Sequence, residues 1–95
     1  MTTMPKMRFP LGRVVSTTGA LEALERNQDT PFPYLDRHMR GDWGVVCPED
    51  AAENDLSVKE GFRILSAYDL ADKTRIWCLT EADRSVTTIL LPDEY

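Results

Sequence analysis

The stretch Thr74–Pro92, TRIWCLTEADRSVTTILLP, decides the fold of this chain. It contains two runs of β-branched, aromatic and aliphatic residues on either side of a short polar break, Glu81–Arg84. This pattern predicts a β-hairpin with a short loop. Side chains alternate along a strand, and both faces of each run carry apolar residues. We therefore expect the hairpin to lie well inside a sheet, covered on one face and partly covered on the other.

Two further strands are predicted outside the hairpin. Phe62–Leu70 is rich in residues that favour strands, and only the short turn 71–73 separates it from the hairpin. Pro10–Thr17 predicts a first strand, with the β-branched pair Val14 and Val15 at its centre. The last three strands are consecutive and closely connected, so we expect them to form an antiparallel meander.

Three short helices are predicted between the first strand and the second. They cover 19–27 after an N-cap threonine, 31–40 after a proline, and 47–59 before a terminating Gly61. The apolar residues expected to face the core are Ala20, Leu21 and Leu24 in the first helix, Phe32, Leu35 and Met39 in the second, and Ala51, Ala52 and Leu56 in the third. The order β-α-α-α-β-β-β predicts an α+β fold, an antiparallel sheet with short helices packed on one face.

Length and composition predict a single globular domain. The chain has 95 residues, of which 42% are hydrophobic and 28% are charged. We expect residues 1–9 to form a flexible N-terminal leader, with Met1, Met4 and Met7 as alternative starts, and residues 10–95 to form the domain. No apolar run approaches the roughly 20 residues of a membrane span. No signal-peptide pattern is present either, so we expect a cytoplasmic location.

The cysteines and the single histidine predict neither a metal site nor a cofactor. A metal site needs three or four ligands, whereas this chain offers two thiols and one imidazole, far apart in sequence. In a reducing compartment Cys47 and Cys78 are expected to be free thiols, one of them packed in the core. The glycine-rich phosphate loops and the GxSxG and HExxH motifs are all absent from the sequence, and nothing else in it indicates a cofactor.

The charge balance makes direct nucleic-acid binding an unfavourable hypothesis. The net charge is −5, whereas a general nucleic-acid binder carries a basic excess. Six acidic residues lie in the stretch from Asp42 to Glu60, and Lys59 is the only basic residue there. This stretch either keeps the protein soluble or meets a basic surface on a partner. The acids that would form such a face are Glu49, Asp50, Glu53, Asp55 and Glu60.

The first candidate site is the stretch RHMRGDWG, which begins at Arg37. His38 could act as an acid or a base near neutral pH, with Asp42 orienting it. Arg37, Arg40 and Trp43 are of the residue types that dominate protein–protein contacts. The structural alternative is that the bases complement a helix C-terminus, the aspartate bonds its own turn and the tryptophan fixes the loop to the core.

The second candidate site is the hairpin loop. Glu81, Asp83 and Arg84 lie there between two hydroxyl residues, a set that could bind an ion or a polar ligand. The alternative is an ordinary polar turn, in which Glu81 and Arg84 form an exposed ion pair worth about 0–1 kcal/mol. A further row of hydroxyl residues on the strands is interpreted as sheet structure: Ser66, Tyr68, Thr87 and Thr88.

Several motifs resemble a family of small bacterial proteins. They are LGRVV at 11–15, GAL at 19–21, RHxxGDWG at 37–44, ED at 49–50, Asn54, LSAY at 65–68, IW at 76–77 and TEADRSxTTxLLPxEY at 80–95. Members of this family are called plasmid-related proteins, and some carry the label of a type I restriction system subunit. The resemblance implies an association with mobile or accessory DNA and implies no particular activity. No cofactor motif of a methylating subunit is present.

These observations lead to three functional hypotheses. The first is a non-enzymatic module that binds another protein, and an uncovered strand edge would also allow a homodimer. The second is a small hydrolase or nuclease in which His38 works with Asp42, Glu81 or Asp83, which requires the helix end and the hairpin loop to meet. The third is an acidic inhibitor of a DNA-processing or defence system.

Overall fold

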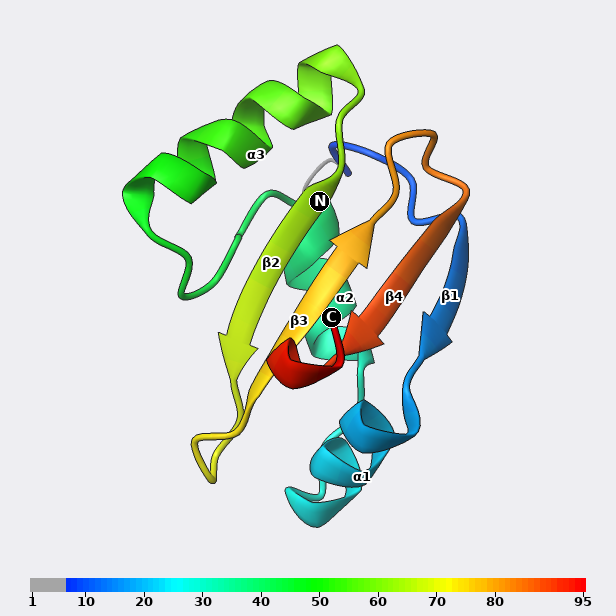
Figure 1. Cartoon of the computed structure of the whole chain (residues 1–95), viewed down its shortest axis with the longest axis vertical. Helices are drawn as coiled ribbons and strands as arrows, with labels where there is room; N and C mark the ends of the chain where they lie inside the picture. The colour runs from blue at the N-terminus through cyan, green and yellow to red at the C-terminus, as the bar shows by residue number, and fades with distance from the viewer. Residues whose placement is uncertain (1–6) are drawn as a thin grey trace, which may run out of the picture.

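The hairpin at the centre of the sheet forms as predicted. In the computed structural model, which describes residues 7–95, β3 (Arg75–Thr80) pairs antiparallel with β4 (Val86–Leu90). β2 (Ile64–Asp69) pairs antiparallel with β3 on its other side. β1 (Arg13–Ser16) lies beyond β4, so the strand order is β1-β4-β3-β2 (Figure 1). The α+β class and the element order are therefore confirmed.

The sheet is mixed, and the prediction of a wholly antiparallel sheet was wrong at one pair. β1 runs parallel to β4, with Val14 opposite Thr87 and Ser16 opposite Ile89. Parallel neighbours need a long crossover connection, and the segment between β1 and β4 supplies one. The alternation of residues within β1 could not reveal which strand would become its neighbour.

The helices lie close to their predicted bounds. They are α1 (Thr18–Arg26), α2 (Phe32–Met39) and α3 (Pro48–Glu60). The Thr17 hydroxyl accepts a hydrogen bond from the Ala20 amide at 3.1 Å and so caps α1. Proline stands in the first turn of both other helices, and α3 ends at Gly61, whose φ of +78° favours glycine.

Helices α1 and α2 pack on one face of the sheet, which we call the inner face, and α3 packs along the β2 edge. α2 lies behind the sheet in Figure 1, while α3 lies beside β2. The main core consists of Ala20, Ala23 and Leu24 from α1, Leu35 from α2, and Tyr68, Leu70, Ile76, Cys78 and Ile89 from the sheet region. A second cluster joins Phe9, Trp43 and Ile64, with Ala51 and Val58 of α3 packed against it.

The predicted inward faces of the helices were partly wrong. Leu21 and Leu56 are exposed, and Phe32 is 73% exposed. The residues buried in the helices that the prediction omitted are Ala23, His38, Asn54 and Ser57. Three of these four are polar, so an apolar-stripe rule cannot select them.

The domain begins earlier than predicted. The Arg8 amide donates to the carbonyl of Met39 at 2.8 Å, and the Phe9 ring is buried. Arg8 and Phe9 therefore belong to the packed fold rather than to the leader. The rest of the predicted leader, except for Met7, lies outside the described residues.

On the opposite face of the sheet, which we call the outer face, residues 7–95 place no long helix. A short 3₁₀ turn, η1 (Pro92–Glu94), lies in front of the sheet (Figure 1), and the ring of Tyr95 packs 5.7 Å from that of Trp77. The side chains of this face include Leu65, Ala67, Trp77, Leu79, Thr88 and Leu90. Among the described residues, no helix is long and apolar enough to cross a membrane.

Candidate functional site

His38 lies in the core, within a chain of hydrogen bonds between side chains. Its Nδ1 bonds to the hydroxyl of Ser66, and its Nε2 bonds to the hydroxyl of Thr80 at 2.8 Å. The Thr80 hydroxyl also bonds to that of Thr87 at 2.7 Å. Thr87 in turn donates to the carbonyl of Leu11 at 2.8 Å. The hydroxyl row interpreted as sheet structure thus includes one partner of the histidine, Ser66, and a later member of the chain of bonds, Thr87; it omits the other partner, Thr80.

The surroundings of His38 keep its ring neutral. Burial lowers its pKa to about 4, and the positive charge of Arg84 contributes in the same direction. The rings of Phe9 and Trp43 pack against it, with centroids 5.1 and 5.9 Å away. Both ring nitrogens are engaged by hydroxyl groups, so neither is free to exchange a proton with a substrate.

Asp42 contacts the arginine next to His38 rather than His38 itself. The Nε of Arg37 donates to Asp42 Oδ2 at 2.7 Å, and this bond holds the pKa of the carboxyl below its usual range. Asp42 also accepts from the amide of Gly44 at 3.2 Å. The guanidinium of Arg37 lies over the Tyr68 ring, 4.6 Å from its centroid. These contacts shape the glycine-bounded turn.

The other two residues singled out at this turn have structural contacts. Trp43 is 6% exposed, and its indole N–H donates to Asp55 Oδ1 at 3.1 Å. Its ring is therefore not available on the surface of this fold. Arg40 pairs with Asp36 one helical turn earlier, at 2.9 Å.

Arg84 ties the hairpin loop to the end of α3. Its guanidinium donates to the carbonyls of Phe62 at 2.7 Å and Ser57 at 2.8 Å. Glu81 pairs with Arg63 at 3.3 Å, and the ion pair with Arg84 that an ordinary polar turn could have contained does not form. The interaction with carbonyls places Arg84 in a structural contact, like the arginines of the turn.

The helix end and the hairpin do meet, but not through carboxylates. The contact is the bond between His38 and Thr80, the last residue of β3. Asp83 accepts from the amide of Ser85 at 3.0 Å, and bonding to Ser85 lowers the pKa of its carboxyl. The arrangement offers no general acid–base pair at His38.

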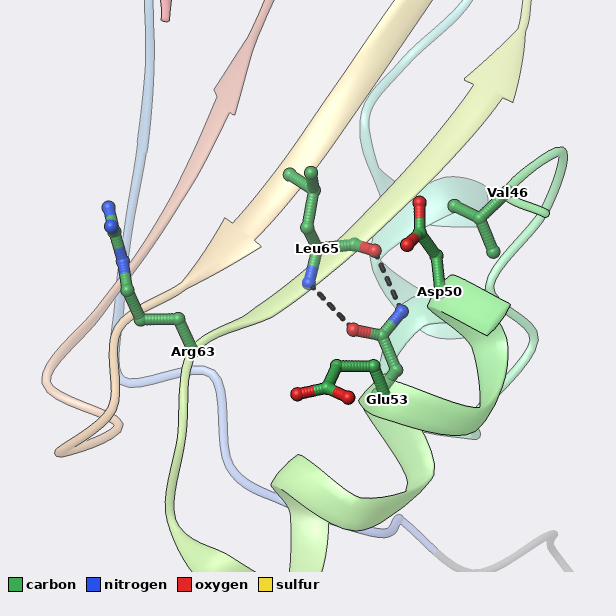
Figure 2. A pocket seen from close by; sticks show the side chains of 6 residues that line it. Val46, Asp50, Glu53, Arg63 and Leu65 are labelled. Atoms are coloured by element: carbon green, nitrogen blue, oxygen red, sulfur yellow. Dashed lines mark hydrogen bonds between the residues drawn. The ribbon is translucent and has the colours of Figure 1, made fainter. Parts of the chain in front are cut away.

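A groove that the sequence did not reveal lies on the outer face, between α3 and β2. It consists of two adjoining hollows of about 220 and 320 Å³ that share Val46, Asp50 and Leu65. The remaining lining residues are Val45, Cys47, Glu53, Asn54, Arg63, Ala67, Arg75 and Trp77. Figure 2 shows Asp50 and Glu53 on one side of Leu65 and Arg63 on the other.

The charges that line the groove are unequally compensated. Arg63 is paired with Glu81, and Arg75 is paired with Asp69 at 2.8 Å. Asp50 and Glu53 form no ion pair with any of residues 7–95. The groove therefore has an apolar floor, and its uncompensated charge is negative.

The described part of the chain contains no cluster of metal-ligating residues, and both of its cysteines are free thiols. No group of three histidine, cysteine, aspartate or glutamate side chains there could hold a metal ion. Cys47 is free and exposed at the groove, and Cys78 is free and buried. Burial raises the pKa of the Cys78 thiol to about 12, which keeps it protonated.

No protein-family model matches this chain, and comparisons with curated proteins and with solved structures give no match either.

Proposed function

We propose that this protein is a small non-enzymatic domain that binds another protein through the groove on its outer face. The proposal rests on the groove, which is an apolar hollow on the outer face of the sheet. Its floor includes Leu65, Ala67 and Trp77. Tryptophan is among the residue types that dominate binding energy at protein interfaces.

The charges of the groove define the chemistry of the partner. Asp50 and Glu53 form one wall and have no cationic partner among the described residues. A segment carrying a lysine or arginine beside an apolar side chain would satisfy both the wall and the floor. We therefore propose an extended basic–apolar segment of another protein as the occupant.

The acidic stretch does not present a single charged face, which favours a local groove over a broad acidic surface. Asp55 is turned toward the N-terminal segment, where it bonds to Arg8 at 2.9 Å and to Trp43. Only Asp50 and Glu53 of the five acids line the groove. A partner segment of limited extent therefore fits better than the broad basic surface that an acidic inhibitor of a DNA-processing system would meet.

As part of this proposal, we place the protein in the cytoplasm of a bacterium. Its two free thiols suit a reducing compartment. The resemblance to plasmid-related proteins is compatible with the same setting and suggests that the partner is encoded by, or acts on, accessory DNA.

Selection from a displayed random peptide library would test the proposed function. We expect the selected peptides to combine a basic residue with an apolar neighbour. Their affinity should fall at least about tenfold in Trp77→Ala, which removes an apolar contact of the floor. It should fall by a similar factor in Asp50→Lys, which reverses a charge of the acidic wall. Phe32→Ala is the matched control, since this more exposed aromatic side chain lies outside the groove.

Two results would count against the proposal. One is a set of peptides that binds the folded Trp77→Ala variant as tightly as the unaltered protein. The other is selection without enrichment of basic residues. Circular dichroism and thermal unfolding of each variant establish beforehand that the fold is intact.

A further inference from the structure

The two edges of the sheet differ in how their backbone groups are satisfied. At the β2 edge, Asn54 Nδ2 donates to the carbonyl of Leu65 at 2.8 Å, and the Leu65 amide donates back to Asn54 Oδ1 at 3.2 Å. The next outward residue, Ala67, accepts from Val45 at 2.8 Å and donates to Trp43 at 3.1 Å. These contacts block strand addition at Leu65 and Ala67.

The β1 edge has no such cover within the described residues. Arg13 donates to the carbonyl of Ser85 at 3.0 Å, and Thr17 donates to that of Ile89 at 2.9 Å, so alternate residues of β1 face β4. The amides and carbonyls of Val14 and Ser16 consequently point away from the sheet. In Figure 1, β1 forms the outermost strand on its side. Val14 is 43% exposed.

We propose that β1 pairs antiparallel with β1 of a second copy of this chain, joining two sheets into one. The two-fold axis passes beside Val15, which is 37% exposed. In this register Val14 lies opposite Ser16 of the second copy, and Ser16 lies opposite its Val14. Each of these two pairs exchanges both backbone hydrogen bonds, as the hydrogen-bonded pairs of an antiparallel ladder do.

The same register brings opposite charges together. Arg13 lies opposite Thr17 of the second copy. Val14 and Ser16 pair with Thr87 and Ile89, whose side chains lie on the inner face, so the alternating side chains of Arg13 and Thr17 lie on the outer face. The Thr17 hydroxyl donates to the carboxylate of Glu94 at 2.6 Å, which fixes that charge beside the strand. Bonding to Thr17 and to the Leu91 amide lowers the pKa of Glu94, so the carboxylate is ionised near neutral pH.

Each dimer therefore contains two symmetric contacts between Arg13 and Glu94 of the other copy. Neither residue has an ion-pair partner among residues 7–95. The edge strand has only four residues, so we expect a weak dimer that forms reversibly as the concentration rises. The groove lies at the other end of the strand order, so both copies keep it open.

The first test measures mass against concentration by analytical ultracentrifugation, from about 10 μM to about 1 mM, the range suited to so small an interface. We expect the unaltered protein to shift from monomer toward dimer. Val14→Pro removes an outward N–H without breaking the β1–β4 ladder, and proline is tolerated on edge strands. This variant should remain folded and monomeric throughout the range.

The second test uses charge reversal and does not depend on the proline variant. Arg13→Glu and Glu94→Lys each place like charges at both contacts, so each variant alone should weaken association at least about tenfold. An equimolar mixture of the two places opposite charges at both contacts. Association should therefore recover in the mixture as a heterodimer.

The proposal is overturned by a monomer at every concentration, or by a dimer that persists unchanged in folded Val14→Pro. It is also overturned if mixing the two charge variants fails to restore association. Thermal unfolding establishes that both charge variants are folded, since Glu94 also accepts bonds within its own chain.

Discussion

His38 shows how a single polar side chain can be held in an apolar core without loss of hydrogen bonds. Thr87 donates its hydroxyl proton to the Leu11 carbonyl, so it must accept from Thr80, and Thr80 must then accept from Nε2–H of His38. Nδ1 consequently accepts from Ser66. The carbonyl at one end thus sets the direction of the whole chain of bonds and fixes the histidine tautomer.

The low pKa of His38 makes stability depend on pH. Its folded pKa of about 4 lies below the ordinary histidine pKa of 6.5, so between these values the unfolded chain binds more protons. The free energy of unfolding should therefore fall as the pH drops from 6.5 to 4, by up to about 3 kcal/mol from this residue. Urea unfolding at a series of pH values measures the effect.

His38→Gln separates this contribution from that of the carboxyl groups. The variant should be less stable at neutral pH but should lose most of the slope between pH 6.5 and 4. An unchanged slope would mean that other groups cause the dependence. Nitrogen-15 NMR of the imidazole provides an independent reading, because the bond pattern requires the neutral Nε2–H form.

Arg84 should matter for stability more than its place in a hairpin loop suggests. Its planar guanidinium reaches the carbonyls of Phe62 and Ser57 together, which a lysine ammonium cannot do in the same geometry. Arg84→Lys should therefore cost about 2 kcal/mol of unfolding free energy. Arg26→Lys, at an exposed ion pair with Asp72, should cost less than about 1 kcal/mol. Equal losses would contradict this role for Arg84.

At the scale of elements, turn and cap residues predicted where helices and strands lie, but not which helical face is buried. Thr17, Pro48 and Gly61 act locally, so their effects can be recognised in the sequence. α3 lies beside the backbone of a strand edge, so its inward face uses the amide of Asn54 together with the apolar side chains of Ala51 and Val58. No periodicity of hydrophobic residues signals such a contact.

Asn54→Asp tests the importance of this contact between α3 and β2. The change keeps an acceptor for the Leu65 amide but places a carboxylate against the Leu65 carbonyl, which loses its donor. We expect a loss of about 1–3 kcal/mol in unfolding free energy and faster hydrogen exchange at the Leu65 amide. Glu53→Gln, an exposed change on the same helix, should alter stability by less than about 0.5 kcal/mol. Similar losses for both variants would indicate that the helix as a whole is sensitive.

At the scale of the molecule, the two faces of the sheet differ in what they contact. The inner face packs against the helices and provides the core, while the outer face carries the groove. The meander of β2, β3 and β4 could be predicted because consecutive strands with short connections pair locally. The position of β1 and the groove could not, because each brings together segments distant in sequence. Its lining comes from three separate stretches of the chain, represented by Val46 and Asp50, by Leu65 and by Trp77.

The two tryptophans provide the most direct measurement of where a partner binds. In a ¹H–¹⁵N correlation spectrum each gives a separate indole N–H signal, one from buried Trp43 and one from Trp77 in the groove. We predict that a selected basic–apolar peptide shifts the Trp77 signal and the amides of β2 while leaving the Trp43 signal in place. Binding that instead shifts signals around Arg37 and Arg40, and leaves Trp77 unchanged, would contradict the groove as the binding surface.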